Sequence, residues 1–228
     1  MTFEELQTQL GIQFNDPQLL KLAFVHRSHL NESHDFTESN ERLEFLGDAV
    51  LSFITSEYLY KTYPKYPEGT LTNIRSTLVK TKSLGSVAAT LGLGQLLLLS
   101  RGEESSGGRS NESLLADCFE ALLGAIYLDL GIEAARTHLQ KTLLYKTEEI
   151  IKTKSYVDFK SLLQELVQEK TKISPLYRVV KSEGPDHDKT FWVEVVSEEQ
   201  VIGSGSGKSK QEAEQRAAQA ALEARGEI

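Results

Sequence analysis

The sequence predicts an all-α domain followed by a small α+β domain whose elements run in the order α-β-β-β-α. Two observations support this prediction. Up to about residue 150, apolar residues recur every three or four positions, which is the period of amphipathic helices. Beyond residue 157, two runs with alternating apolar residues, PLYRVV and TFWVEVV, and a shorter run, QVIGSGSG, lie between two helical patterns. A chain of 228 residues, 39% of them hydrophobic, is long enough for both domains.

The first domain is predicted to consist of consecutive helices separated by turn signals. Asp16 and Pro17 supply a cap and a first-turn proline, residues 64–69 (PKYPEG) end a helix, and the Gly/Ser stretch at 101–113 separates two more. Within that stretch we expect a turn and then a helix capped by Ser110 or Asn111. The predicted helices span residues 3–10, 16–26, 41–63, 71–92, 113–130 and 131–144.

We place the first domain at residues 1–149, a short linker at 150–156 and the second domain at 157–228. The linker contains no glycine, so we expect limited but real freedom between the domains. In the last helix, Ala213, Ala217, Ala220 and Ala221 form a small-residue face that can lie close against a sheet.

Composition narrows the class of protein. No run approaches the roughly 18 apolar residues of a membrane span, and MTFEELQTQL lacks the features of a signal peptide. The single cysteine, Cys118, excludes an internal disulfide and a CxxC metal site, and its apolar surroundings predict a small buried hydrophobe. We therefore expect a cytoplasmic protein with no membrane partner. The net charge of −8 argues mildly against binding nucleic acid by bulk electrostatics, although an acidic total can hide local basic stripes.

The stretch ERLEFLGDAV, residues 41–50, places three carboxylates in a helix that is otherwise mainly apolar. Glu41, Glu44 and Asp48 are spaced i, i+3 and i+7, which puts them on one helix face. Like charges at this spacing repel one another, more strongly once water is removed, so the face is either fully solvated or holds something positive. Gly47 costs this helix about 1 kcal/mol relative to alanine. A close helix–helix or subunit contact explains this glycine more simply than a substrate contact does.

A second helix repeats the pattern, because Asp117 and Glu120 are i and i+3 within LLADCFEALLGAIY. Oxygen ligands without His or Cys suit hard cations such as Mg²⁺ or Mn²⁺. Such ions serve phosphate chemistry by activating a water and stabilising a leaving oxygen. Glu68 is a further candidate, and the alternative for it is a helix N-terminal acid favoured by the macrodipole.

Other chemistries have weaker support in the sequence. His26, His29 and His34 lie close together, but we prefer a structural role to a metal pair because carboxylates already supply a site. SSGGR lacks the GK[ST] of a phosphate-binding P-loop, and no GxSxG nucleophile elbow occurs. For Phe191 and Trp192 we expect packing on the sheet and no stacking on bases.

The motifs NERLEFLGDAVL (40–51), PEGTLTNIRSTLV (67–79) and GEESSGGRSNESLLADCFEALLGAIYLD (102–129), followed by the α-β-β-β-α tail, resemble bacterial ribonuclease III over essentially the whole chain. The resemblance implies an all-α endonuclease domain that dimerises, followed by a small α+β double-stranded-RNA-binding domain. The metal-binding acids it implies are Glu44, Asp48, Asp117 and Glu120, of which Asp48 and Glu120 are expected to be catalytic. The further acids it places near the cleavage valley are Glu41 and Glu68.

The tail resembles a domain that recognises A-form RNA by shape, because side chains cannot read the deep major groove. Gln211 departs from the family pattern, which has a lysine at this position, and acidic residues outnumber basic ones in the tail. The lysines at the start of the last helix would also benefit from the preference of a helix N-terminus for anions. The implied contacts are Gln164 and Glu165 with 2′-hydroxyls, Gly184, Pro185 and His187 with a second minor groove, and Lys208 and Lys210 with phosphates.

The resemblance therefore implies a Mg²⁺-dependent homodimer, with Mn²⁺ able to substitute and no small-molecule cofactor. It implies cleavage of both strands of double-stranded RNA to 5′-phosphate and 3′-hydroxyl products, in rRNA and other RNA processing. We expect the dimer interface to use the helix that contains Phe45, Leu46 and Gly47. The alternative is a double-stranded-RNA-binding regulator that dimerises but no longer cleaves, and the intact acids disfavour it.

Overall fold

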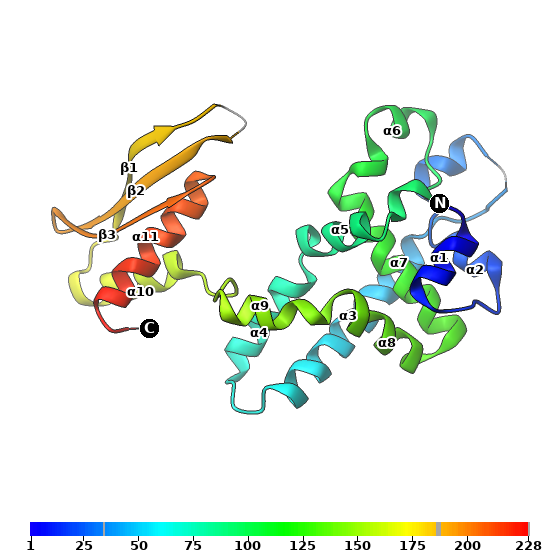
Figure 1. The fold of residues 1–228 in the computed structure, drawn as a ribbon, viewed down its shortest axis with the longest axis horizontal. Coiled ribbons are helices and arrows are strands. Elements are labelled where there is room, and N and C mark those ends of the chain that lie inside the picture. Colours follow the sequence, from blue (N-terminus) through cyan, green and yellow to red (C-terminus); the bar gives the residue numbers. More distant parts are fainter. Residues whose placement is uncertain (34, 186–187, 228) are drawn as a thin grey trace. The chain divides into compact units, whose positions relative to one another are not determined.

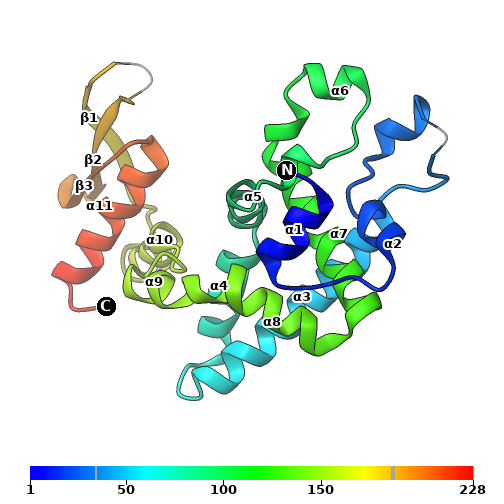
Figure 2. The ribbon, with the colours of Figure 1, turned by 45° about the vertical axis from the view of Figure 1, so that its right-hand side comes forward.

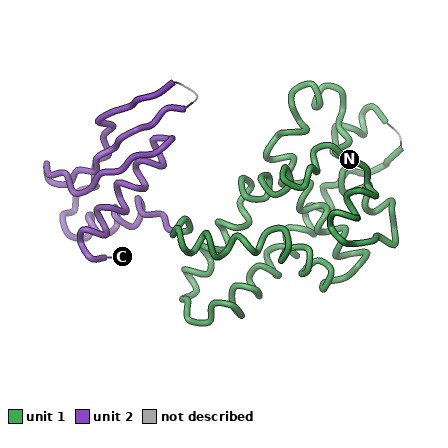
Figure 3. The backbone as a smooth tube through the Cα atoms, viewed as in Figure 1, with its two compact units in different colours: residues 1–156 green, residues 157–228 purple. Residues whose placement is uncertain are grey.

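The computed structural model describes residues 1–33, 35–185 and 188–227. The chain forms two units, residues 1–156 and residues 157–228, which Figure 3 colours separately. The first unit is helical apart from one isolated β-bridge, and the second has the order α-β-β-β-α (Figure 1). The predicted fold class is therefore confirmed. No helix in the described part of the chain combines the length and the apolar character that a membrane crossing requires.

The first unit contains longer helices joined by short 3-10 turns. Its α-helices are α1 (Phe3–Leu10), α2 (Pro17–Leu22), α3 (Glu41–Thr62), α4 (Glu68–Val79), α5 (Thr81–Thr90), α6 (Arg101–Ser105), α7 (Glu112–Leu130), α8 (Ile132–Thr142) and α9 (Thr147–Lys152). Its 3-10 turns are η1 (Arg27–Asn31), η2 (Leu93–Gln95), η3 (Gly108–Ser110) and η4 (Leu144–Lys146).

The helix starts follow the capping chemistry of the sequence. Asp16 accepts hydrogen bonds from two backbone N–H groups of α2, and Pro17 is its first residue. Asn111 caps α7 by accepting from the N–H groups of Ser113 and Leu114. Of the two caps expected for this helix, Asn111 is therefore the one used.

The prediction of a single helix over residues 71–92 is wrong, because the chain forms two helices that meet at Lys80. The backbone of Lys80 is extended, with ψ of 148°, so it ends α4 and starts α5. The break lets α5 turn and pack against α7, where a β-carbon on Gly85 would lie 2.6 Å from the Glu112 carbonyl oxygen. Both helices bury apolar residues at helical spacing, so the periodicity continues across the change of direction.

Helix α7 is the central helix of the first unit. Its residues from Leu115 to Ile126 are nearly all buried, and α2, α3, α5 and α8 contact it. Figure 2 shows these helices around it. Cys118 is a fully buried free thiol in this helix, as the sequence predicted.

Helices α3 and α7 cross at two glycines. A β-carbon on Gly47 of α3 would overlap the Glu120 carbonyl oxygen of α7, and one on Gly124 of α7 would overlap the Leu43 carbonyl oxygen of α3. The backbones therefore approach too closely for any side chain at either position. The packing explanation of Gly47 is confirmed, and this glycine is buried within its own chain.

The second unit packs two helices on one face of a three-stranded sheet. It consists of α10 (Phe159–Thr171), β1 (Leu176–Glu183), β2 (Thr190–Ser197), β3 (Gln200–Gly207) and α11 (Lys210–Ala224), and the antiparallel strands have the order β1-β2-β3. Its core joins residues of α10 and β2 to the small-residue face of α11: Phe159, Leu163, Val167, Val193, Val195, Ala213, Ala217, Ala218, Ala221 and Leu222.

Small residues on β3 let α11 lie close to the sheet. β-Carbons on Gly203 and Gly205 would clash with backbone atoms of Ala217 in α11. The segment between the two cores also has a defined structure. Residues 150–152 extend α9, and Ile150, Ile151 and Tyr156 pack against the core of the first unit.

Candidate metal centre and RNA-binding surfaces

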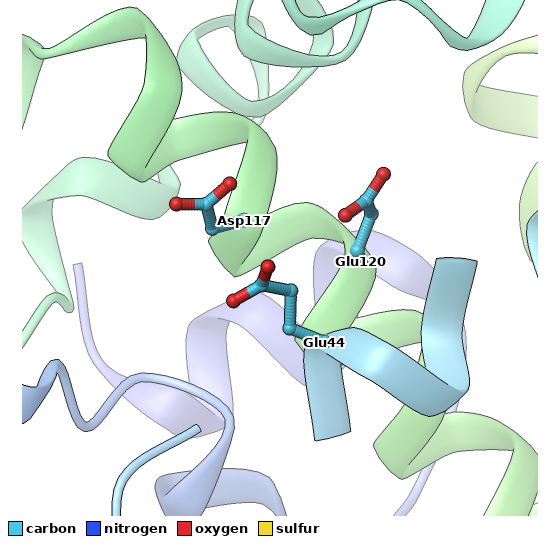
Figure 4. Close-up of side chains that lie close together, drawn as sticks. All are labelled: Glu44, Asp117 and Glu120. Atoms are coloured by element: carbon cyan, nitrogen blue, oxygen red, sulfur yellow. The ribbon is translucent and has the colours of Figure 1, made fainter. Parts of the chain in front are cut away.

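Three carboxylates converge where α3 crosses α7. Glu44 comes from α3, and Asp117 and Glu120 come from successive turns of α7. One oxygen of each carboxylate lies within 4.8 Å of the others. Figure 4 shows the three side chains and the helices that carry them. The glycine crossing accounts for this arrangement, because it brings the acidic face of α3 directly onto that of α7.

The surroundings of these acids disfavour their charged forms. The pKa of Glu120 is raised to about 8, mainly by burial and then by the charges of Asp48, Glu44 and Asp117 in that order of importance. Burial is also the main cause of the raised pKa of Glu44 and of Asp117. Within the described ranges, no Lys or Arg forms an ion pair with any of the three. The cluster is therefore a concentration of negative charge that protein cations leave uncompensated.

The donor set fits a hard divalent cation. All three groups offer carboxylate oxygens, the ligands that Mg²⁺ and Mn²⁺ prefer, and none is a His or Cys. Three carboxylates also leave coordination positions for water and for a phosphate oxygen. A cation held here would offset the repulsion that raises the pKa values of these acids.

The structure separates the other predicted acids from this cluster to different degrees. Asp48 is exposed one turn further along α3 and contributes no ligand atom to the group, although its charge raises the pKa of Glu44 and Glu120. Glu41 accepts a hydrogen bond from the Ser39 hydroxyl (2.7 Å) and lies 3.8 Å from Arg27.

Glu68 is in a different environment at the start of α4. Its carboxylate accepts a hydrogen bond from the Thr72 hydroxyl (2.8 Å), as expected of an acid in the first turn of a helix. It lines a pocket of about 420 Å³ together with residues such as Phe53 and Arg75, and that pocket contains none of the three clustered acids.

A pocket of about 240 Å³ opens beside Glu44 and Asp117. Sequence reasoning missed two of its residues, His26 and Asn40, since it gave His26 a structural role. The spacing of the acids could not have indicated His26, because its segment reaches them only by pairing with a distant segment: Val25 bridges to Leu98. Asn40 directly precedes Glu41, so its position in the acidic motif was the available signal. The pocket is lined by His26, Arg27, Asn40, Glu41, Glu44, Leu97, Leu114 and Asp117. His29 is not among them, and His34 lies outside the described residues.

The predicted RNA contacts of the second unit lie on its surface. Gln164 and Glu165 are exposed on α10, and Lys210 is exposed at the start of α11. Gly184 has a φ of +102°, a conformation that favours glycine, and it is followed by the exposed Pro185. His187 lies outside the described residues.

The remaining predicted phosphate contact, Lys208, already has a partner. Its Nζ lies 2.6 Å from a carboxylate oxygen of Asp188, and its backbone N–H donates to Glu212 (2.8 Å). Glu212 also pairs with Arg216 at 2.6 Å. The N-terminal end of α11 is therefore rich in charge of both signs.

The two aromatic residues on β2, Phe191 and Trp192, both have partners within the second unit. Phe191 packs against the core of the second unit. Trp192 is partly exposed, and the Nζ of Lys181 lies 5.1 Å from the centre of its ring.

Two family models match the chain, one for each unit. The Ribonuclease-III-like model matches residues 16–147, and the double-stranded RNA binding motif matches residues 159–224. Ribonuclease 3 of Treponema denticola is 47% identical over 96% of this chain and 89% of its own length. Ribonuclease 3 of Geobacillus kaustophilus is 48% identical over 97% of this chain and 90% of its own length.

A solved structure supports the same relationship for the first unit. The nuclease domain of ribonuclease III from Campylobacter jejuni is 40% identical with a TM-score of 0.58, covering 62% of this chain and 95% of that one. It is described as showing structural flexibility in a region involved in dimer formation. Because the relatives match along almost the whole chain, in both units, the chain belongs to the ribonuclease III family and is an endoribonuclease.

Proposed function

We propose that this endoribonuclease cuts both strands of double-stranded RNA and depends on a divalent cation, with Mg²⁺ as the natural ion and Mn²⁺ able to replace it. The observation that supports this most directly is the convergence of Glu44, Asp117 and Glu120 without a protein cation among them. Half-buried acids that repel one another are costly unless a cation offsets their charge.

The acidic residues are proposed to have distinct roles in cation binding and catalysis. Glu44, Asp117 and Glu120 hold and orient the cation, and Asp48 joins them from the exposed edge of α3. Asp48 and Glu120 are proposed as the catalytic residues. A bound divalent cation supplies an activated water and stabilises the charge on the leaving oxygen. Glu41 and Glu68 are proposed to lie near the cleavage valley because they match further acids of the family there, and both are exposed.

Cutting two strands requires two sites at a fixed separation, which a two-fold dimer provides. Phe45 supports this proposal because it is 81% exposed on α3 and lies at the edge of a pocket of about 620 Å³ whose lining is half leucine. In a two-fold interface, Phe45 of one protomer can enter the pocket of the other. Leu46 lines that pocket, whereas Gly47 is buried against α7 and is not available to a partner.

The second unit is proposed to hold the RNA duplex through the exposed residues of α10, the segment after β1 and the start of α11. The products would carry 5′-phosphate and 3′-hydroxyl ends, and the cellular role would be processing of rRNA and other RNAs in the cytoplasm. These are implications of family membership, and each can be tested on the purified protein or in the cell.

The decisive experiment is cleavage of a labelled RNA duplex by the full chain. We expect paired cuts in Mg²⁺ or Mn²⁺, no cuts after chelation, and recovery when Mg²⁺ is restored. End-labelling identifies the phosphate at each new 5′ end, and sedimentation at micromolar concentration identifies the dimer. Binding of the duplex without cleavage in any divalent cation would instead establish the alternative, a binding regulator.

A further inference from the structure

His26 occupies a rigid position beside the acidic pocket. Its backbone N–H donates to the Leu98 carbonyl (3.1 Å), and the preceding residue, Val25, accepts from the Asn40 N–H (2.8 Å). The Asn40 side chain also donates to the Ala23 carbonyl (3.1 Å). The segment is thus tied to two other parts of the chain, and the imidazole projects from a fixed backbone.

The hydrogen bonds of Ser28 determine which nitrogen of His26 carries the proton. The Ser28 hydroxyl oxygen accepts from the Ser100 backbone N–H (3.0 Å), and it lies 2.8 Å from Nδ1 of His26. Nδ1 also faces the Ser28 backbone N–H (3.3 Å), which can only donate. Nδ1 is therefore an acceptor, and the neutral ring must carry its proton on Nε2.

The Nε2–H group is a donor without a protein acceptor. No residue of the described chain accepts a hydrogen bond from it, because the hydrogen bonds of the ring all involve Nδ1. With Nδ1 turned to Ser28, the opposite edge of the ring is the one available to the pocket, which His26 lines together with Glu44 and Asp117.

The pocket needs a donor if a phosphate is to lie beside its carboxylates. Carboxylates accept hydrogen bonds and repel phosphate oxygens, which also accept them. Of the other polar donors in the lining, Arg27 has a largely exposed side chain that lies 3.8 Å from Glu41, and the Asn40 amide donates to the Ala23 carbonyl. His26 differs from them because hydrogen bonds at Nδ1 fix its ring, while its Nε2–H has no acceptor among the described residues.

We propose that the Nε2–H of His26 donates a hydrogen bond to a non-bridging phosphate oxygen of the RNA strand held at the acidic cluster. Ser28 is the positioning residue that fixes this tautomer. The inference rests on the proposed cleavage of double-stranded RNA and adds to it a substrate contact outside the carboxylate set.

The test compares two substitutions at His26 in the full chain. His26→Phe keeps a flat ring but removes the donor, whereas His26→Gln keeps an N–H near the position of Nε2. A hydrogen bond to a charged oxygen supports an expected loss of about 10-fold to 100-fold in cleavage efficiency for the Phe variant. The Gln variant should retain most of the activity. His29→Phe, the same substitution outside the pocket lining, is the control and should cut like the parent.

Two readouts separate this role from a structural or metal-binding one. Nitrogen-15 NMR of histidine-labelled protein should show the Nε2–H tautomer of His26 in the free protein. Its signal should move when an RNA duplex and Mg²⁺ are added to the Glu120→Gln variant. Ser28→Ala should allow the Nδ1–H tautomer, and Ser28→Thr should restore the original one. Binding of Mn²⁺, measured by electron paramagnetic resonance, should be unchanged by His26→Phe.

The outcomes distinguish this inference from the proposed function. If the parent cuts RNA while His26→Phe cuts equally well, the phosphate contact is refuted and the proposed function stands. Weakened Mn²⁺ binding in His26→Phe would also refute it, since His26 would then act through the metal ligands. If the parent does not cut double-stranded RNA at all, the proposed function itself fails.

Discussion

The two units of this protein handle charge in opposite ways. The first unit gathers Glu44, Asp117 and Glu120 in a half-buried cluster with no basic partner among the described residues. The second unit spreads its charges over an exposed surface and pairs many of them, as in the contact of Lys208 with Asp188. Repulsion among half-buried charges is strong, whereas exposed pairs are screened by water and salt. Single substitutions should therefore change cleavage or stability strongly in the first unit, and should change duplex binding only slightly, in a salt-dependent way, in the second.

The largest effect is expected for Glu120→Gln. Glutamine preserves the size of the side chain but is a neutral and weaker ligand, so cleavage in Mg²⁺ should fall by about 1,000-fold or more. Without metal the variant should melt at an equal or higher temperature, because one repelling charge is gone. Dimerisation and duplex binding should stay close to those of the parent. An unfolded variant would make Glu120 a structural acid, and normal cleavage would place the metal site elsewhere.

The next largest effect is expected where α3 crosses α7. Gly47→Ala inserts a methyl group into the space of the Glu120 carbonyl, so the helices must separate. Overpacking of this kind costs about 1–3 kcal/mol, which chemical denaturation can measure. Cleavage should also fall, since separation of the helices pulls Glu44 away from α7.

The matched control is Gly69→Ala, because nothing lies within 4 Å of a β-carbon at this position on α4. It should leave stability unchanged or raise it slightly. Equal stability of Gly47→Ala and Gly69→Ala would show that the crossing adapts to a side chain.

The pH dependence of stability follows from the raised pKa of Glu120, from 4.5 to about 8. The folded protein binds this proton more tightly than the unfolded chain does. The resulting stabilisation is complete below about pH 4.5 and is lost as pH rises through 8. Without metal, the parent should lose on the order of 1–2 kcal/mol more than Glu120→Gln between pH 5 and 9, after allowance for partial solvent exposure.

Thermal melting at several pH values measures this difference. Mg²⁺ should remove most of it at pH 8–9, because the cation favours the charged carboxylate. Melting curves that stay parallel for parent and variant at every pH would contradict the burial of this charge.

In the second unit, changing both Lys208 and Lys210 to alanine should weaken duplex binding to the same extent for different sequences. If both side chains contact phosphates, the slope of log affinity against log salt should become shallower by about one to two units. Lys170→Ala provides a control, since Lys170 is an exposed lysine that pairs with Glu227. An unchanged slope in the double variant would remove these lysines from the interface.

The smallest effect is expected for Asp188→Asn. Asp188 holds the side chain of Lys208 in an exposed ion pair, so its neutralisation should release that lysine and tighten duplex binding by about 2-fold to 5-fold at low salt. The gain should vanish at high salt because the charges are screened. Gln211→Lys should produce a similar modest gain, and Glu227→Gln, which breaks a comparable pair elsewhere, should produce none.

The sequence by itself determined the order of elements, the two-domain plan and the identity of the acids, because each depends on residues close together in the chain. Helical periodicity places Glu44 on one face of α3 and aligns Asp117 with Glu120 on α7. Capping chemistry likewise identified the starts of α2 and α7 at Asp16 and Asn111. The family motifs are the basis for proposing that these acids serve a metal-dependent nuclease.

The tertiary structure alone decided which of these groups meet. The break at Lys80, the crossing at Gly47 and Gly124, and the approach of His26 to Asp117 all depend on contacts between distant segments. The acids Glu41, Glu44 and Asp48 of α3 illustrate the difference. They share one face in sequence, yet the crossing with α7 draws in Glu44 and leaves Glu41 and Asp48 exposed, because two helices packed at an angle touch over a short length only.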